Sequence, residues 1–123
     1  MKRKLDYAYC KAAPVLEWMS HKWTLVILLR IEAHQKTLGK RGIRFGDLFR
    51  TIPAISEKML ASTLEYLEGE GLVFRQAHNE ASPYVEYTLT PLAEKFLREI
   101  EYVMEWGQIH YSEIMEARNR QQT

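Results

Sequence analysis

The helical and strand patterns between residues 44 and 90 constrain the fold of this chain more than any other feature of its sequence. Ser56 can cap a helix in which Leu60, Leu64 and Leu67 recur on one face at helical spacing. The opposite face of that helix carries polar and charged side chains. We therefore expect a helix that packs on the core through its leucines and leaves its other face free for a partner.

The residues that flank this helix predict a hairpin on one side and a short helix on the other. Glycines within residues 69–71 end the helix, and residues 72–76 and 84–89 then predict two strands around a polar loop. Before it, residues 46–51 predict a short helix that a proline stops, and residues 43–45 predict a third short strand. This order is typical of a winged helix-turn-helix, a mainly α fold with a small β-wing.

The rest of the chain predicts a helical core and one loop. A first helix covers residues 12–19, Ser20 can cap the next helix, and residues 23–31 are apolar on nearly every side, as in a central helix. Residues 35–42 lack an apolar period and predict a flexible surface loop. A threonine and a proline then start one long helix over residues 91–117.

The apolar stripe of the last predicted helix is too long for one small domain to cover. At 1.5 Å per residue that helix would be about 40 Å long. We therefore expect its excess stripe to pack against a second copy of the chain. The residues assigned to this dimer contact are Leu92, Phe96, Ile100, Val103, Trp106 and Ile109.

The length of 123 residues fits one domain with a modest core. We find no internal repeat that would divide the chain further. Within a single winged helix-turn-helix domain, residues 1–123, we expect an N-terminal arm and helix at residues 1–20, the helix-turn-helix and wing at residues 44–90, and a dimerisation helix at residues 91–117.

The composition argues against a membrane or secreted protein. No run of roughly 18 apolar residues is present, and the basic amino end lacks the apolar stretch of a secretory signal. The single cysteine, Cys10, excludes an internal disulfide and fits a reducing compartment. We therefore expect a cytoplasmic protein with no membrane partner.

Charge is distributed unevenly along the chain, although the net charge is only +1. Residues 36–58 hold six lysines and arginines against two acidic residues, a surplus of four positive charges. Residues 86–116 hold seven glutamates against one lysine and one arginine, a surplus of five negative charges. The basic end of the molecule should therefore coincide with the helix-turn-helix, as expected for nucleic-acid binding.

The major groove of DNA is wide enough to admit the free face of the helix that Ser56 caps. Side chains on that face could reach base edges, whereas arginines on flanking elements are better placed to bind phosphates. The competing interpretation is a solvated helix face, with surface salt bridges for the arginines, and Glu65 in particular should face solvent. The residues assigned to DNA contact are Arg44, Arg50, Ser56, Lys58, Ala61, Ser62, Arg75, His78 and Asn79.

The sequence carries no pattern typical of a metal site or a catalytic centre. Its four histidines are scattered, no second cysteine completes a zinc set, and there is no phosphate-binding glycine loop or nucleophile elbow. We therefore expect no cofactor, no metal and no enzymatic activity. Trp18, Trp23 and Tyr66 could line a pocket for an aromatic effector, although such residues are more often part of the core.

The motifs between Cys10 and Gly107 resemble the HxlR-type regulators, a branch of the MarR-like winged helix-turn-helix transcription factors of bacteria. The resemblance implies homodimers built from the first and last helices, operator binding by both recognition helices and wings, and transcriptional control of nearby genes. Its main carriers are Cys10, Lys22-Trp23, Arg44-Phe45, Ile52-Pro53, Ile55-Ser56, Lys58-Met59-Leu60, Gly71-Leu72-Val73, Val85-Glu86-Tyr87, Leu89-Thr90 and Trp106-Gly107.

The resemblance predicts a sequence-specific, DNA-binding transcriptional regulator that acts as a homodimer on a roughly palindromic operator. The alternative is a winged-helix protein interaction module without DNA binding, because the net charge is small. Some relatives use a cysteine at the position of Cys10 to sense oxidants or electrophiles, so an oxidant or another small molecule is a candidate effector. The alternative for Cys10 is an inert, partly buried thiol. Tyr84 stands where the wing commonly has arginine, which predicts a weaker minor-groove contact.

Overall fold

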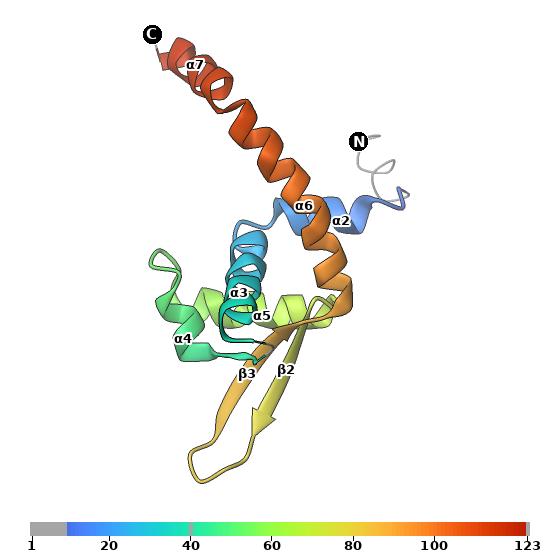
Figure 1. Cartoon of the computed structure of the whole chain (residues 1–123), viewed down its shortest axis with the longest axis vertical. Coiled ribbons are helices and arrows are strands. Elements are labelled where there is room, and N and C mark those ends of the chain that lie inside the picture. The colour runs from blue at the N-terminus through green and yellow to red at the C-terminus, as the bar shows by residue number, and fades with distance from the viewer. Residues whose placement is uncertain (1–9, 40, 123) are drawn as a thin grey trace.

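Two parts project from the helical body of the protein, a two-stranded wing and a rod formed by the last two helices (Figure 1). The computed structural model describes residues 10–39 and 41–122. In chain order its elements are α2 (Ala13–Ser20), α3 (Thr24–Leu38), β1 (Ile43–Arg44), α4 (Phe45–Arg50), α5 (Glu57–Gly69), β2 (Val73–His78), β3 (Tyr84–Leu89), α6 (Pro91–Ile109) and α7 (Tyr111–Gln122). This order confirms the predicted mainly α fold with a small β-wing.

The helical body is built around α3, as the apolar run in the sequence predicts. Ile27, Leu28 and Ile31 of this helix are fully buried. Each buried leucine or isoleucine contributes roughly 1.5–3 kcal/mol to folding, so this cluster holds the neighbouring elements in place. The buried side chains around α3 include Leu48, Leu60, Leu64, Leu67, Leu72, Leu89 and Leu97.

The sheet is antiparallel with strand order β1-β3-β2, so β3 lies in its centre. The register places Arg44 of β1 opposite Glu86 of β3, and His78 of β2 opposite Tyr84 of β3. The predicted third strand is therefore confirmed, although Phe45 already belongs to α4. The far ends of β2 and β3 extend away from the helices as the wing (Figure 1).

Two predicted caps set the start of α5 and of α6. Oγ of Ser56 accepts a hydrogen bond from the backbone N–H of Met59 (3.0 Å), and Oγ1 of Thr90 accepts one from Ala93 (3.1 Å). The Thr90 hydroxyl also donates to the carbonyl of Gly71 (2.7 Å), whose φ of 77° lets the chain turn from α5 into β2. One side chain therefore ties the start of α6 to the end of α5.

The predicted cap at Ser20 is wrong. α3 begins after Trp23, whose side chain makes no capping hydrogen bond. The hydroxyl of Ser20 instead donates to the carbonyl of Glu17 (2.8 Å). The reason is that Ser20 is the last residue of α2, where its hydroxyl can satisfy one of the free carbonyls at the helix end.

The predicted surface loop over residues 35–42 is wrong for its first half, because α3 continues to Leu38. Oε1 of Gln35 accepts a hydrogen bond from the backbone N–H of Leu89 in β3 (2.9 Å). This bond gives the polar end of α3 a tertiary partner, which no local apolar period reveals. The helix ends at Gly39, where a φ of 78° suits glycine.

The predicted continuous helix over residues 91–117 is also wrong, because α6 and α7 meet at His110. The imidazole of His110 stacks on Trp106, with 4.5 Å between ring centroids, and its Nδ1 lies 3.1 Å from Oε1 of Glu113. These contacts accompany a local change of backbone conformation at His110 (φ −100°, ψ 15°). Its N–H still bonds to the Trp106 carbonyl (3.0 Å), so the two helices continue as one projecting rod (Figure 1).

The first described helix, α2, lies against α6, so the first and last parts of the chain share one side of the molecule (Figure 1). Most of the predicted N-terminal arm, residues 1–9, lies outside the described residues. Among the helices that the structure describes, none combines the length and apolarity needed to cross a bilayer.

Candidate nucleic-acid interface

The free face of α5 is exposed as its sequence pattern predicts. Ser56 begins the helix, and the leucine stripe on its underside is buried in the core. Lys58, Ala61 and Ser62 are exposed on the other side. Together with Arg75 of β2 they line one groove between α5 and the sheet. The structure therefore brings four of the predicted DNA-contacting residues to one surface.

Two carboxylates share this groove with the cationic side chains. Glu65 and Glu68 line it beside Lys58 and Arg75, so the positive charge lies at the N-terminal half of α5 and on β2. The partial positive charge of the helix dipole is also at the N-terminal end. Glu68 is not among the predicted site residues, although its i, i+3 spacing from Glu65 indicates that both carboxylates lie on the same face of the helix.

Arg44 and Arg50 lie together in a second groove, between α4 and the wing, which Phe45, Tyr84 and Val85 also line. The guanidinium carbon of Arg44 lies 3.7 Å from the centroid of the Tyr84 ring. Arg50 forms an ion pair with Asp47 one turn earlier in α4, which is the competing arrangement expected for such an arginine. Arg50 is therefore already paired with a carboxylate, whereas the partner of Arg44 is an aromatic ring.

The remaining predicted contacts are on the wing. His78, the last residue of β2, stacks on Tyr84 with ring centroids 4.5 Å apart, and its Nε2 lies 3.0 Å from Oε1 of Glu86. Asn79 follows it in the wing loop and is exposed. The imidazole of His78 is therefore engaged within the sheet, whereas the side chain of Asn79 is accessible.

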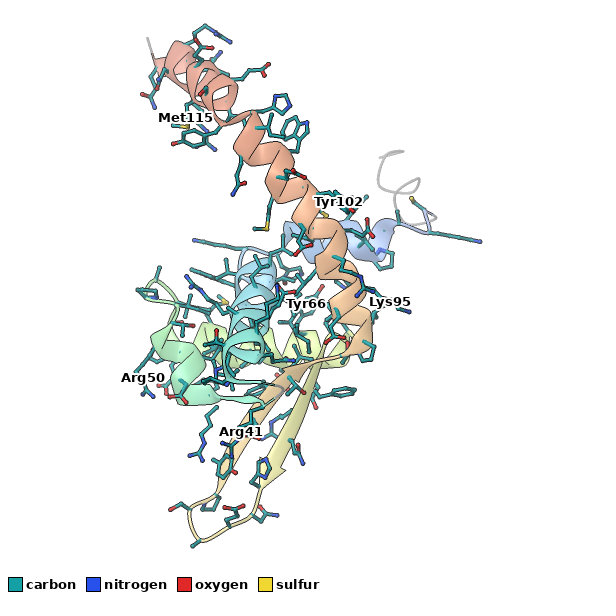
Figure 2. The ribbon with its side chains drawn as sticks, in the orientation of Figure 1. Arg41, Arg50, Tyr66, Lys95, Tyr102 and Met115 are labelled. Atoms are coloured by element: carbon teal, nitrogen blue, oxygen red, sulfur yellow. The ribbon has the colours of Figure 1, made fainter. Side chains whose placement is uncertain are left out.

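An apolar groove between α2 and α6 contains most of the residues assigned to the dimer contact. Val103 is 52% exposed on this groove, whereas Phe96 and Ile100 are 9% and 3% exposed, because they also pack in the core. Trp106 and Ile109 lie farther along α6 and are exposed. The side chains that line the groove are Val15, Trp18, Met19, Leu92, Lys95, Phe96, Glu99, Ile100 and Val103; Figure 2 labels Lys95 and, farther along α6, Tyr102.

Trp18 connects this groove to the end of α5. Its indole packs edge-on against Phe96, with 5.2 Å between ring centroids, and its Nε1 donates a hydrogen bond to Oε1 of Glu70 (2.8 Å). Glu70 is the residue that follows α5 and caps it. No local sequence pattern indicates this contact, because it joins residues 52 positions apart.

The three aromatic residues considered for an effector pocket all pack on the hydrophobic core. Trp18 lines the groove between α2 and α6, while the ring of Tyr66 stacks on His21, with 4.3 Å between centroids. Trp23 packs against the core with the ammonium group of Lys22 5.1 Å from its ring. These contacts agree with the structural interpretation of the three residues.

Cys10 lies just before α2 and is an exposed, free thiol. Its Sγ accepts a weak hydrogen bond from the backbone N–H of Ala12 (3.4 Å). The exposure departs from the alternative of a partly buried thiol. Across the described residues, no three histidine, cysteine, aspartate or glutamate side chains are grouped so that they could hold a metal ion.

A short helix, an exposed second helix with an apolar underside, and a two-stranded wing define a winged helix-turn-helix protein. The sequence model of the HxlR-like helix-turn-helix proteins matches residues 18–115, and the chain belongs to this family. It is therefore a member of a family of helix-turn-helix transcriptional regulators, as the resemblance predicts.

Individual relatives support the same assignment. The HTH-type transcriptional regulator YtfH of Escherichia coli is 33% identical over 110 residues, which cover 89% of this chain and 82% of the relative. A solved MarR-family structure from Porphyromonas gingivalis W83 is 40% identical, with a TM-score of 0.68, and covers 81% of this chain and 91% of its own. The reduced form of YodB from Bacillus subtilis is 28% identical, with a TM-score of 0.67, over 80% and 90% of the two chains.

Proposed function

We propose that the protein is a sequence-specific DNA-binding regulator that acts as a homodimer on a roughly palindromic operator. The observation that carries the proposal is the exposed face of α5, where Lys58, Ala61 and Ser62 adjoin Arg75 of the wing. In this arrangement α5 enters the major groove with its N-terminal half, and side chains on that half read base edges. The second groove contacts the phosphate backbone through Arg44, whereas Arg50 in the same groove is already paired with Asp47.

A homodimer would present two such helices at once. The apolar groove between α2 and α6 supplies a surface that a second copy can cover, and the exposed Val103 lies on it. The two α5 helices would then enter successive major grooves about 34 Å apart, so the operator would be an approximate palindrome. Contact with about six phosphates would give a slope near −5 in a plot of log affinity against log salt.

Replacement of Lys58 and Arg75 tests this proposal. We expect Lys58→Ala together with Arg75→Ala to lower affinity for the selected operator by roughly thirty-fold, because each change removes one charge-assisted contact worth about 1 kcal/mol. Both residues are exposed, so the melting temperature should stay within about 2 °C of the wild type. Fluorescence anisotropy on an operator selected from random DNA measures the change.

The matched control removes the same charge elsewhere. Arg98→Ala together with Arg118→Ala takes two exposed positive charges from α6 and α7, and should leave operator affinity within about threefold of the wild type. Equal losses in both double variants would mean that net charge, not the α5 surface, determines binding. A wild-type protein that flows through immobilised duplex DNA at low salt would instead favour the protein interaction module.

We also propose that Cys10 makes the regulator responsive to oxidants. Its thiol is exposed, and the similar protein YodB has been solved in a reduced form and after diamide treatment. Diamide would take two electrons and two protons from two Cys10 thiols, one from each protomer, leaving one disulfide and a hydrazine. This bond requires the two α carbons to approach within about 7 Å.

Cys10→Ser should abolish the response to diamide. We expect diamide to change the operator affinity of the wild type at least fivefold and to produce a disulfide-linked dimer on a non-reducing gel. Neither change should occur in the variant, since serine cannot form a disulfide. Dithiothreitol should reverse the wild-type change. Identical anisotropy curves for both proteins after diamide would refute this role for Cys10.

A further inference from the structure

A stack of side chains crosses all three strands where β2 and β3 meet the wing loop. The guanidinium of Arg44 on β1 lies over the ring of Tyr84 on β3, with 3.7 Å between its central carbon and the ring centroid. The imidazole of His78 from β2 lies almost parallel to the same ring, at 17° and 4.5 Å between centroids. Glu86 of β3 completes the group, with its Oε1 3.0 Å from Nε2 of His78.

The strand order explains why these residues meet. Tyr84 and Glu86 are two residues apart on the central strand, so their side chains point to the same face of the sheet. The register places His78 directly opposite Tyr84, and Arg44 opposite Glu86. Since β1 and β2 flank β3 on opposite sides, the guanidinium and the imidazole approach the Tyr84 ring from opposite sides.

In the stack, the partner of the Arg44 guanidinium is an aromatic ring. Within the described part of the chain no carboxylate lies at ion-pair distance from Arg44, and Oε1 of its register partner Glu86 lies 3.0 Å from Nε2 of His78. A guanidinium that rests on an aromatic ring through its flat face keeps the N–H donors along its edge available. Arg50 in the same groove is in the opposite situation, because Asp47 already accepts from its guanidinium.

We propose that Arg44 is the principal phosphate-binding side chain of the groove between α4 and the wing, and that Tyr84 is its positioning residue. The ligand is a backbone phosphate of duplex DNA, so this inference rests on the proposed function. A guanidinium binds a phosphate through two parallel N–H donors, and this geometry depends strongly on orientation. The Tyr84 ring fixes that orientation before binding, which lowers the conformational entropy lost when the complex forms.

A double-mutant cycle separates positioning from direct contact. We expect Arg44→Ala to weaken operator binding about tenfold and to make the salt slope less steep by about one, as the loss of one phosphate contact requires. Tyr84→Leu, which removes the ring, should weaken binding about fivefold. In the Arg44→Ala background, Tyr84→Leu should have no further effect, because there is no guanidinium left to position.

Two matched variants complete the experiment. Tyr84→Phe keeps the aromatic face and should bind within twofold of the wild type. Arg50→Ala removes the same charge from the same groove and should cost less than threefold, because Asp47 already engages Arg50. In the free protein, the side-chain δ protons of Arg44 should show an upfield ring-current shift by NMR in the wild type and in Tyr84→Phe, and lose it in Tyr84→Leu.

The outcomes distinguish the possible failures. If Tyr84→Leu lowers operator affinity by the same factor in the wild-type and Arg44→Ala backgrounds, Tyr84 does not act through Arg44. That result would overturn the positioning role. An operator affinity that is unchanged in Arg44→Ala would overturn the inference but not the proposed function. Equal losses of affinity in Arg44→Ala and Arg50→Ala would do the same. A wild-type protein that binds no duplex DNA would overturn the proposed function, and this inference with it.

Discussion

Val103→Glu is expected to convert the proposed dimer into monomers, with a dissociation constant at least a hundredfold larger than that of the wild type. Val103 is 52% exposed in the single chain and lies on the apolar groove between α2 and α6. In a two-fold symmetric interface the substitution occurs twice, and it places two carboxylates where apolar side chains would otherwise meet. Loss of about 3 kcal/mol corresponds to the hundredfold change.

Gln108→Glu is the matched control for this prediction. It introduces the same charge into α6, at an exposed position about 140° around the helix from Val103, and it should leave the dimer intact. Sedimentation velocity over a range of protomer concentrations measures both dissociation constants, and circular dichroism checks that both variants are folded. If Val103→Glu sediments like the wild type at every concentration, the groove is not the dimer surface.

Leu64→Ala should lower the free energy of unfolding by about 3 kcal/mol. Leu64 is on the underside of α5 and is 2% exposed, so truncation removes its transfer free energy and leaves a cavity in the hydrophobic core. The same side chain supports the helix that presents Lys58 and Ser62. The loss should therefore appear also as weaker operator binding at temperatures near the unfolding transition.

Urea unfolding followed by circular dichroism measures this loss, at one fixed protomer concentration because the proposed dimerisation would add to apparent stability. Glu65→Ala is the control, since this residue is adjacent in α5 but exposed, and its replacement should change stability by no more than about 0.5 kcal/mol. A loss below about 1 kcal/mol for Leu64→Ala would mean that the packing beneath α5 collapses to fill the cavity.

Features with a local chemical cause were predictable from the sequence. The caps at Ser56 and Thr90 were predicted because a hydroxyl precedes an apolar helical pattern in both cases. The free face of α5 followed from the 3.6-residue period of its leucines. These confirmed predictions needed only residues close together in the chain.

The errors involve contacts between distant residues or side-chain interactions that compete with a local pattern. The end of α3 was missed because Gln35 bonds to Leu89, 54 positions away. The boundary between α6 and α7 at His110 was missed because an apolar stripe continues across it, while the His110 ring packs on its neighbours. The stack of Arg44 on Tyr84 depends on the strand order, which the sequence pattern does not specify.

The hydrogen bond from Trp18 to Glu70 has a thermodynamic consequence. One indole ring lines the groove where a second copy is proposed to bind, and also holds the residue that caps α5. If a second copy in the groove shifted this ring, it would change the stability of the end of α5, the helix proposed to enter DNA. Such linkage is reciprocal, so an operator that favours one position of α5 would then change the free energy of subunit association by the same amount.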